Sequence, residues 1–331
     1  MAIPRKSALI CGITGQDGSY LAQFLLKKGY VVWGTSRDAQ GSSCANLRIL
    51  GISAHITILT MAPEDFRSVF MAVKKSEPTE IYYLAGQSSV GLSFELPAET
   101  IQSVVLGTLN MLEACRIFGN GIRFYHAGSS ECFGDTMGHP AYETTQFHPR
   151  SPYAVAKASA FWLVDNYREA YKLFACTGIL FNHESPLRSS RFVTQKIIQA
   201  AKRIALGSKE TLLLGRTDIA RDWGWAPEYV EAMWLMLQLQ SPEDFVIATG
   251  KTYTLEDFVR VTFEKANLDW KKHVKQSNEL LRPTDLAISR ADPSKAKRIL
   301  GWQAKLDMPI VIDRMMAENT LKTDPPTKLL L

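Results

Sequence analysis

The feature that most constrains the fold is a glycine-rich turn near the start of the chain. Gly12, Gly15 and Gly18 are spaced three apart, after an apolar run and before apolar residues at helical spacing. In a strand–turn–helix unit, the first glycine permits a tight turn and the second lets the backbone approach a pyrophosphate at the helix N-terminus. The third lets the helix lie close to the sheet. The turn therefore predicts a dinucleotide-binding βαβ unit rather than a turn that merely needs glycine.

The rest of the first half repeats this alternation. We predict strands at residues 7–13, 30–34, 56–59, 81–84, 123–127 and 175–181, and helices at residues 66–74, 100–118 and 153–171. Such alternation predicts an α/β fold with a Rossmann-type, doubly wound parallel sheet. We assign residues 1–185 mainly to this domain. Residues 186–331 are predicted to form mainly a smaller mixed α/β domain that caps the sheet, with some chain exchange and helices at 193–206, 227–239, 255–266 and 293–300.

Composition excludes several classes of protein. With 46% hydrophobic and 21% charged residues over 331 positions, the chain is predicted to be soluble and globular. The net charge of +5, without a basic run, argues against nucleic acid and leaves small anionic ligands. Five cysteines without a C-x-x-C pair predict neither disulfides nor a metal site, and the apolar stretch at residues 8–13 is too short for a signal or membrane segment. We expect a cytoplasmic protein with no membrane partner.

The end of the second predicted strand bears on the choice of nicotinamide cofactor. It reads Thr35-Ser36-Arg37-Asp38, where an acidic residue would accept the ribose hydroxyls of NAD and an arginine would bind a 2′-phosphate. Arg37 favours NADP. NAD stays possible because Asp38 is adjacent.

Two further segments carry the residues expected to do chemistry. Tyr153 and Lys157 are four apart at the start of a predicted helix, so that both lie on one face, where the lysine is expected to lower the tyrosine pKa and make it a base. The strand ending at Ala127 leads into a loop with Ser129, which can bind a substrate oxygen, and Glu131. Simple redox chemistry at one carbon needs no extra carboxylate, whereas removing a proton next to a ketone does. Glu131 therefore points to elimination.

With these residues identified, the chain resembles the GDP-mannose 4,6-dehydratases, a family of extended short-chain dehydrogenases/reductases. The resemblance extends from about residue 7 to about residue 319. The most specific matches are at residues 12–21, 147–153, 178–186, 221–224, 229–237 and 248–250.

The resemblance implies a site, residue by residue. It makes Tyr153 and Lys157 the redox pair, Glu131 the proton-transfer carboxylate, Ser129 the hydroxyl that is usually threonine, and Ser130 its catalytic neighbour. The implied cofactor site adds Gly12, Thr14, Gly15, Gln16, Asp17, Gly18, Arg37, Leu84, Ala85, Gln87, His183 and Arg188. The implied nucleotide-sugar site comprises Ser88, Ser129, Glu131, Asn182, Lys196, Arg221, Arg282 and Asp285, the last of which is usually glutamate.

The implied reaction is conversion of GDP-mannose to GDP-4-keto-6-deoxymannose by internal hydride transfer and loss of water. The implied assembly is a homodimer or homotetramer through the helices at residues 100–118 and 153–171. Epimerases, 4-ketosugar reductases and decarboxylases of the same superfamily are rival hypotheses, and a non-catalytic NADP sensor is a rival from another class.

Three departures from the family pattern affect these expectations. The acidic residue usual after the third strand is replaced around Thr60-Met61-Ala62, and a usual tyrosine appears as Glu99. The loop after Arg37 lacks a second arginine. The cofactor choice and a tetramer built through that loop are the expectations most affected.

Overall fold

The central element of the protein is a seven-stranded parallel sheet. The computed structural model describes residues 6–119 and 121–317. The strands are arranged in the order β11-β6-β5-β4-β1-β2-β3, and every pair is parallel. Their bounds are β1 (Ser7–Cys11), β2 (Val31–Ser36), β3 (Thr57–Thr60), β4 (Glu80–Tyr83), β5 (Arg123–Ser129), β6 (Phe174–Leu180) and β11 (Phe245–Ile247). The predicted Rossmann-type fold is confirmed, and the order reverses between β1 and β4, where such sheets bind ligands.

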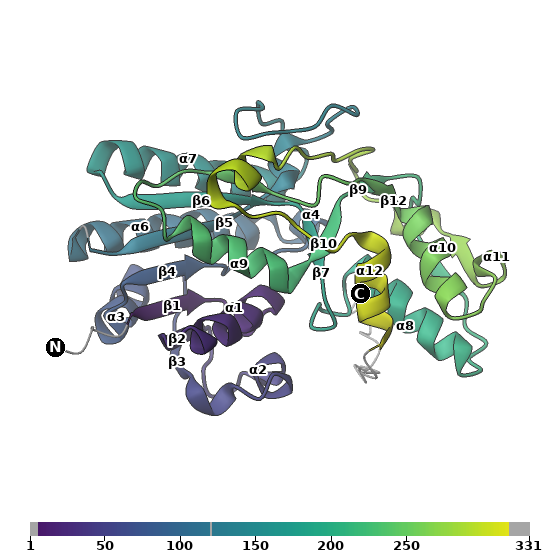
Figure 1. Cartoon of the computed structure of the whole chain (residues 1–331), viewed down its shortest axis with the longest axis horizontal. Coiled ribbons are helices and arrows are strands. Elements are labelled where there is room, and N and C mark those ends of the chain that lie inside the picture. Colours follow the sequence, from purple (N-terminus) through teal and green to yellow (C-terminus); the bar gives the residue numbers. More distant parts are fainter. Residues whose placement is uncertain (1–5, 120, 318–331) are drawn as a thin grey trace.

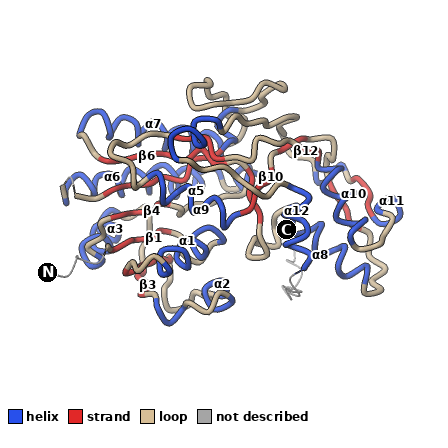
Figure 2. Tube along the Cα trace, viewed as in Figure 1, coloured by secondary structure: helices blue, strands red, loops and turns tan. Residues whose placement is uncertain are grey.

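Helices cover both faces of the sheet (Figures 1 and 2). Neighbouring strand residues point to opposite faces, so Ile10 packs with the helices of one layer and Leu9 with those of the other. The first layer contains α1 (Gln16–Lys27), α2 (Ala45–Ile49) and α9 (Ala226–Met236). The second layer contains α3 (Phe66–Ser76), α6 (Gly107–Phe118) and α7 (Pro152–Tyr171). Apolar residues on both faces of each strand produce the continuous runs seen in the sequence.

The helix predicted at residues 100–118 is divided into three parts. After α4 (Val90–Glu95), the chain forms α5 (Pro97–Ile101), a π-helical turn η2 (Gln102–Leu106) and then α6. The Tyr83 hydroxyl donates a hydrogen bond to the Ser103 carbonyl at 3.2 Å. A side chain at Gly107 would also clash with the Tyr83 ring and Pro63. Contact with β4 therefore accounts for the wider turn, which helical periodicity does not reveal.

The second lobe packs three helices around its own apolar core. These are α8 (Val193–Ala205), α10 (Leu255–Lys265) and α12 (Met308–Ala317). Two-stranded sheets join β7 (Asn182–Glu184) to β10 (Trp223–Trp225), β9 (Ala220–Arg221) to β12 (Tyr253–Thr254), and β8 (Leu212–Leu214) to β13 (Val274–Gln276). Short elements complete the lobe: α11 (Trp270–His273), η4 (Asn278–Leu280) and the π turn η5 (Ala296–Leu300), which replaces most of the helix predicted at residues 293–300. α9 and β11 return to the sheet from beyond residue 186.

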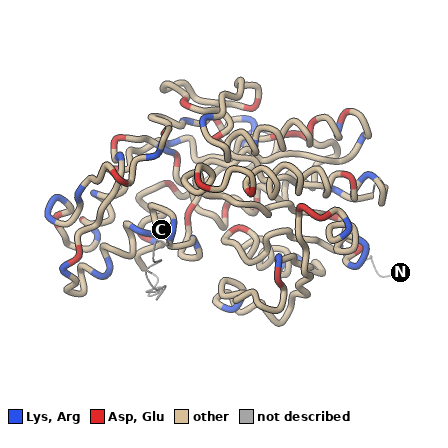
Figure 3. Tube along the Cα trace, turned by 180° about the vertical axis from the view of Figure 1, so that it is seen from behind, with Lys and Arg blue, Asp and Glu red and all other residues tan. Residues whose placement is uncertain are grey.

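Charged residues of both signs are interspersed along the chain (Figure 3). None of the helices in the described ranges is long and apolar enough to cross a membrane. The loose tail expected after Thr320 lies outside the described residues.

A buried carboxylate fastens α9 to the sheet at the edge opposite the glycine turn. Glu80, at the start of β4, is 1% exposed. It accepts hydrogen bonds from Tyr82 at 2.7 Å, Tyr30 at 3.0 Å, and Lys6 and Gln238 at 3.2 Å each. Because these donors come from β4, from the residues just before β2 and β1, and from the turn after α9, one side chain connects four segments.

We therefore expect Glu80→Ala to destabilise the protein strongly. Removing the acceptor leaves buried donors unsatisfied, which costs about 3–5 kcal/mol in the free energy of unfolding. Urea unfolding followed by circular dichroism measures this loss. Glu231→Ala, which removes an exposed glutamate of α9, is the control and should change the free energy by less than about 0.5 kcal/mol. Equal effects of the two substitutions would contradict the role given to Glu80.

Candidate active site

The glycine turn forms an open cradle at the N-terminus of α1. Gly12 has a φ of +83°, and a Cβ there would lie 3.1 Å from backbone atoms of Leu84 and Ala85. A Cβ on Gly18 would lie 2.6 Å from the Ile13 Cα, and the Gly15 amide donates to the Gly12 carbonyl at 3.1 Å. This hydrogen bond fixes the shape of the turn. The N-terminus of α1 carries no side-chain cap, so its backbone amides can bind an anion. Thr14 is partly buried, and its carbonyl accepts the Asn46 side chain.

Three predicted cofactor residues are bound to one another beneath this turn. The Nε2 atom of His183 lies 2.9 Å from the Asp17 carboxylate, and its Nδ1 atom lies 2.7 Å from the Phe181 carbonyl oxygen. Burial lowers the His183 pKa, but the charge of Asp17 and its hydrogen bond outweigh burial, so the His183 pKa is raised. Burial raises the Asp17 pKa, but the neighbouring imidazole outweighs burial there too, so the Asp17 pKa is lowered. Gln16 donates to the His183 carbonyl at 3.1 Å and accepts from Ser185 at 2.7 Å. These contacts fasten β7 to the phosphate turn.

The loop after β4 lies against the glycine turn. Its Gln87 side chain donates to the Ser89 carbonyl at 2.8 Å and to Thr100 of α5 at 3.2 Å. Leu84 and Ala85 are partly buried, and Ser88 is exposed. These four predicted site residues therefore lie at the carboxyl edge of the sheet, next to β1.

The residues predicted to be catalytic come from two adjacent elements. β5 ends in Ser129 and continues as the 3₁₀ turn η3 (Ser130–Phe133), while Tyr153 and Lys157 lie in the first turns of α7. α7 starts where it does because the Ser151 hydroxyl accepts the Ala154 amide at 3.1 Å. Ser129 and Tyr153 are each 8% exposed and are hydrogen-bonded to each other.

The electrostatics of this pair differ from the sequence-based expectation. Burial raises the Tyr153 pKa, and the Ser129 hydrogen bond and the charge of Arg188 oppose this shift without cancelling it. Lys157 is not among the main influences on this pKa: its ammonium donates to the Ala127 carbonyl at 2.8 Å and lies 5.9 Å from the centre of the tyrosine ring. Burial also lowers the Lys157 pKa to about 8. The prediction that Lys157 lowers the Tyr153 pKa toward neutral is wrong for this structure, in which burial raises that pKa.

Two arginines of the second lobe, Arg221 and Arg282, lie close enough to Glu131 for their charges to affect its pKa. Burial raises the Glu131 pKa, while Arg221 and Arg282 oppose the shift without cancelling it. Arg221 is 5% exposed, and its guanidinium lies 3.1 Å from Asp285, which is also 3.6 Å from Arg282. The site thus combines a carboxyl group that protonates easily with two cations suited to phosphate oxygens.

The remaining predicted residues are more scattered. Arg188 lies 3.4 Å from Glu184 and stacks over Phe192. Asn182 is partly buried on β7, and Lys196 is exposed in the first turn of α8. These residues surround the junction of the lobes rather than forming one cluster with Glu131.

Arg37 has an acidic partner that sequence reasoning did not assign. It forms an ion pair with Glu99 of α5 at 3.5 Å, which links the end of β2 to that helix. Asp38 instead accepts the amides of Gln40 at 3.0 Å and Gly41 at 2.8 Å, so its carboxylate caps its own loop. The Arg37–Glu99 pair joins positions far apart in the chain, and no local pattern predicts it.

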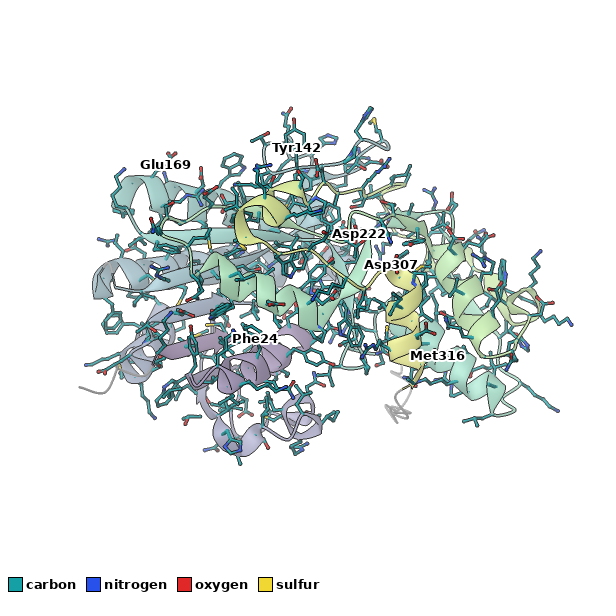
Figure 4. The ribbon with its side chains drawn as sticks, in the orientation of Figure 1. Phe24, Tyr142, Glu169, Asp222, Asp307 and Met316 are labelled. Atoms are coloured by element: carbon teal, nitrogen blue, oxygen red, sulfur yellow. The ribbon has the colours of Figure 1, made fainter. Side chains whose placement is uncertain are left out.

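Two buried or loop-bound aspartates were also missed. Asp135 accepts the Ala287 amide at 2.7 Å, which fixes the loop that carries Asp285. Asp222 accepts the Thr249 and Gly250 amides at 3.0 and 2.8 Å, and burial raises its pKa to about 6. Figure 4 shows Asp222 inside the molecule, near the junction of the lobes. In the sequence, the only feature that pointed to Asp222 was its position next to Arg221.

The geometry can be compared with known proteins. A family model described as GDP-mannose 4,6 dehydratase matches residues 9–315. GDP-mannose 4,6 dehydratase 1 of Arabidopsis thaliana is 45% identical over 326 residues, which cover 96% of this chain and 90% of the relative. The chain belongs to the GDP-mannose 4,6-dehydratase family. The family resemblance stated from the motifs is thereby confirmed.

Solved structures of other proteins share the fold. UDP-glucose 4-epimerase of Thermus thermophilus, in complex with NAD, has a TM-score of 0.81 at 25% identity and covers 94% of this chain and 99% of its own. A structure named RMD from Pseudomonas aeruginosa, complexed with NADPH, has a TM-score of 0.77 at 20% identity and covers 94% and 97%. The second likeness concerns the fold alone. Both neighbours are described in complex with a nicotinamide cofactor.

Proposed function

We propose that the protein is a hydro-lyase that converts GDP-mannose to GDP-4-keto-6-deoxymannose. The observation that supports this most directly is the position of Glu131. It is a carboxyl group of raised pKa, next to the Ser129–Tyr153 pair and under the influence of two arginines. Family membership supports the same reaction.

The residues fit a nicotinamide dinucleotide. A Cβ on Gly12 would press on the backbone of Leu84 and Ala85, and one on Gly18 would press on the backbone of the turn, so the close packing of this turn needs glycine, and α1 begins directly behind it. The glycine turn would hold the pyrophosphate, and Leu84, Ala85 and Gln87 would border the cofactor. When bound, the nicotinamide supplies the acceptor and donor of hydride.

The side chains divide the proton transfers between them. Tyr153 takes the proton of the 4-hydroxyl, while Ser129 holds the same oxygen and stabilises the phenolate. The 4-ketone acidifies the C5 proton, which Glu131 takes and then passes to the departing 6-hydroxyl, so that water leaves. The 5,6-double bond left behind is saturated when C6 receives the hydride removed from C4 and C5 takes a proton from solvent, while Tyr153 releases the proton that it took from the 4-hydroxyl. The raised Glu131 pKa suits both steps, because a carboxyl group that protonates readily is a better base and can return the proton as an acid.

We propose that the nucleotide-sugar binds between the domains assigned to residues 1–185 and 186–331. Arg221 and Arg282 would contact the diphosphate, displacing Asp285 from their guanidinium groups. Asn182, Lys196 and Ser88 are proposed as outer contacts. In this arrangement, Arg221 and Arg282 would bind the diphosphate while Tyr153 would contact the sugar.

Mass spectrometry of the products tests the proposed reaction. The purified protein is incubated with GDP-mannose and, separately, with UDP-glucose and dTDP-glucose. We expect a product that has lost one water from GDP-mannose only. A product of unchanged mass that separates from the substrate on chromatography would indicate an epimerase, and a requirement for reduced cofactor in equal amount would indicate a reductase.

We propose NADP as the cofactor. Arg37 is the cation at the end of β2, and Asp38, which would favour NAD, is occupied by backbone amides. Arg37→Ala should weaken NADP binding about tenfold or more and leave NAD binding nearly unchanged, since only NADP carries the 2′-phosphate. Calorimetric titration with both cofactors measures the two affinities. Equal losses for NAD and NADP would contradict this assignment.

We propose that the protein is a homodimer or homotetramer. Exposed apolar side chains lie on α5, η2 and α7, which pack together, and they include Ile101, Leu106, Val155 and Trp162. A second copy that covers these helices would bury them.

Trp162→Asp should therefore shift the protein from dimer or tetramer towards smaller species. Trp162 is 58% exposed, and a charge at its position would disfavour an apolar interface. Analytical ultracentrifugation at micromolar concentration measures the mass. Leu206→Asp, on an exposed leucine of the second lobe, is the control and should not change it. A wild-type monomer would contradict the proposal.

A cytoplasmic location remains our proposal. It is supported by five cysteines that are free in the structure, and four of them are buried. Fractionation of the source cells would test it.

A further inference from the structure

The Arg37–Glu99 ion pair lies at the position where a 2′-phosphate would have to bind. Thr35 pairs with Cys11, and Ser36 pairs with Thr60, so Arg37 follows the sheet edge at which the glycine turn begins. The loop is held in place there, because the Ala39 amide donates to the Thr60 hydroxyl at 3.2 Å. The side chain of Arg37 can move, since it is 77% exposed.

Glu99 reaches this position from a helix that is anchored to the cofactor crevice. The next residue, Thr100, is fully buried and accepts the Gln87 side chain at 3.2 Å. Thr100 also donates to the Leu96 carbonyl at 2.8 Å. Glu99 itself is 49% exposed and faces Arg37. Its carboxylate therefore stays near the end of β2 even when the ion pair opens.

We infer that Glu99 sets the cofactor selectivity of this protein by competing with the 2′-phosphate of NADP for Arg37. This inference rests on the proposed role of Arg37 in cofactor binding. NADP must displace the carboxylate and then bind beside it, whereas the 2′-hydroxyl of NAD carries no charge. Glu99 therefore narrows the preference for NADP that Arg37 alone would produce.

The size of the effect follows from the exposure of the pair. An exposed ion pair is weak, so the phosphate can break it, but a carboxylate within several ångströms of a phosphate still repels it through water. We expect Glu99 to lower NADP affinity about threefold to tenfold at low salt, and less at high salt as the charges are screened. Its effect on NAD should stay within about twofold.

The test uses Glu99→Gln, which removes the charge and keeps the shape. Calorimetry on the full-length protein measures binding of NADP and NAD, together with the fragments 2′,5′-ADP and 5′-AMP, which differ only in the 2′-phosphate. We expect Glu99→Gln to raise affinity for NADP and 2′,5′-ADP and to leave NAD and 5′-AMP nearly unchanged. Glu95→Gln is the matched control, because Glu95 is an exposed glutamate one helix earlier, and it should alter none of the four affinities.

The Arg37→Ala variant separates this inference from the cofactor proposal. If Arg37→Ala weakens NADP selectively but Glu99→Gln leaves the ratio of NADP to NAD affinity unchanged, only the inference about Glu99 is overturned. The inference about Glu99 is also overturned if Glu95→Gln changes the affinities as much as Glu99→Gln does, because a general effect of charge would then explain both results. If neither Arg37→Ala nor Glu99→Gln changes the ratio, both proposals are overturned.

Discussion

Glu131→Gln should stop the reaction halfway, with reduced cofactor accumulating on the protein. Glutamine cannot take the C5 proton, but the 4-hydroxyl can still lose its proton to Tyr153, so the first hydride transfer remains possible. We expect product formation to fall about 10²- to 10⁴-fold, which is the usual contribution of a positioned acid–base group. The absorbance of the reduced nicotinamide and mass spectrometry of the sugar measure the two halves of the reaction separately.

Two controls make this result specific. Glu169→Gln changes a glutamate at the far end of α7 from the site, as Figure 4 shows, and should leave turnover unchanged. The wild-type protein in deuterated water should place one deuterium at C5 of the product. A fully active Glu131→Gln variant, or a product without deuterium at C5, would show that another group removes this proton.

Tyr153→Phe should abolish turnover and leave both ligands bound. The change removes one buried hydroxyl, which is hydrogen-bonded to Ser129, and keeps the ring. We expect a loss of turnover of about 10³-fold or more, since no other base is placed at the 4-hydroxyl. In this variant, unlike Glu131→Gln, no reduced cofactor should appear, because oxidation of the sugar is the step that fails. Stopped-flow absorbance distinguishes the two variants.

Tyr171→Phe is the matched control on the same helix. Tyr171 is 46% exposed at the end of α7, and loss of its hydroxyl should change turnover less than twofold, as expected for a surface group. Retention of most activity by Tyr153→Phe would mean that another group is the base. Calorimetry on Tyr153→Phe verifies that the cofactor still binds.

The raised Tyr153 pKa also predicts a direction for the pH dependence. The hydroxyl must lose its proton before it can accept one from the sugar, and its pKa is raised, so turnover should keep rising as the pH is raised through neutral into alkaline values. Lys157 is expected to remain charged up to its pKa of about 8 and to hold the loop at Ala127. The lysine thus contributes first to the position of the site, through a backbone carbonyl, rather than to the acidity of the phenol.

Much of the architecture could be predicted because it depends on local patterns. The run from Ser7 and the glycines at 12, 15 and 18 form a pattern of neighbouring residues, and the close approaches at Gly15 and Gly18 lie within the turn itself. The same holds for α7, whose start is set by Ser151 three residues before the amide it caps. The parallel sheet follows from the alternation of such units, because their connections have one preferred hand.

Features that depend on contacts between distant segments could not be predicted in this way. The helix expected at 100–118 contains a π turn because Tyr83, from another strand, binds the Ser103 carbonyl. The four donors around Glu80 come from segments that only the folded chain brings together. Burial at these positions is a property of the whole fold, and it decides which polar groups need partners.

For the site, the sequence alone determined which residue types are available and at which edge of the sheet they lie. The order of glycine turn, Ser129–Glu131 loop and Tyr153–Lys157 helix follows from chain order and helical spacing. Only the tertiary structure decided their charge states and partners. Lys157 donates a hydrogen bond to the Ala127 carbonyl, Glu131 lies near Arg221 and Arg282 of the second lobe, and Arg37 forms an ion pair with Glu99. Spacing along the chain does not contain this information, because a pKa or an ion pair depends on desolvation and on charges brought near in space.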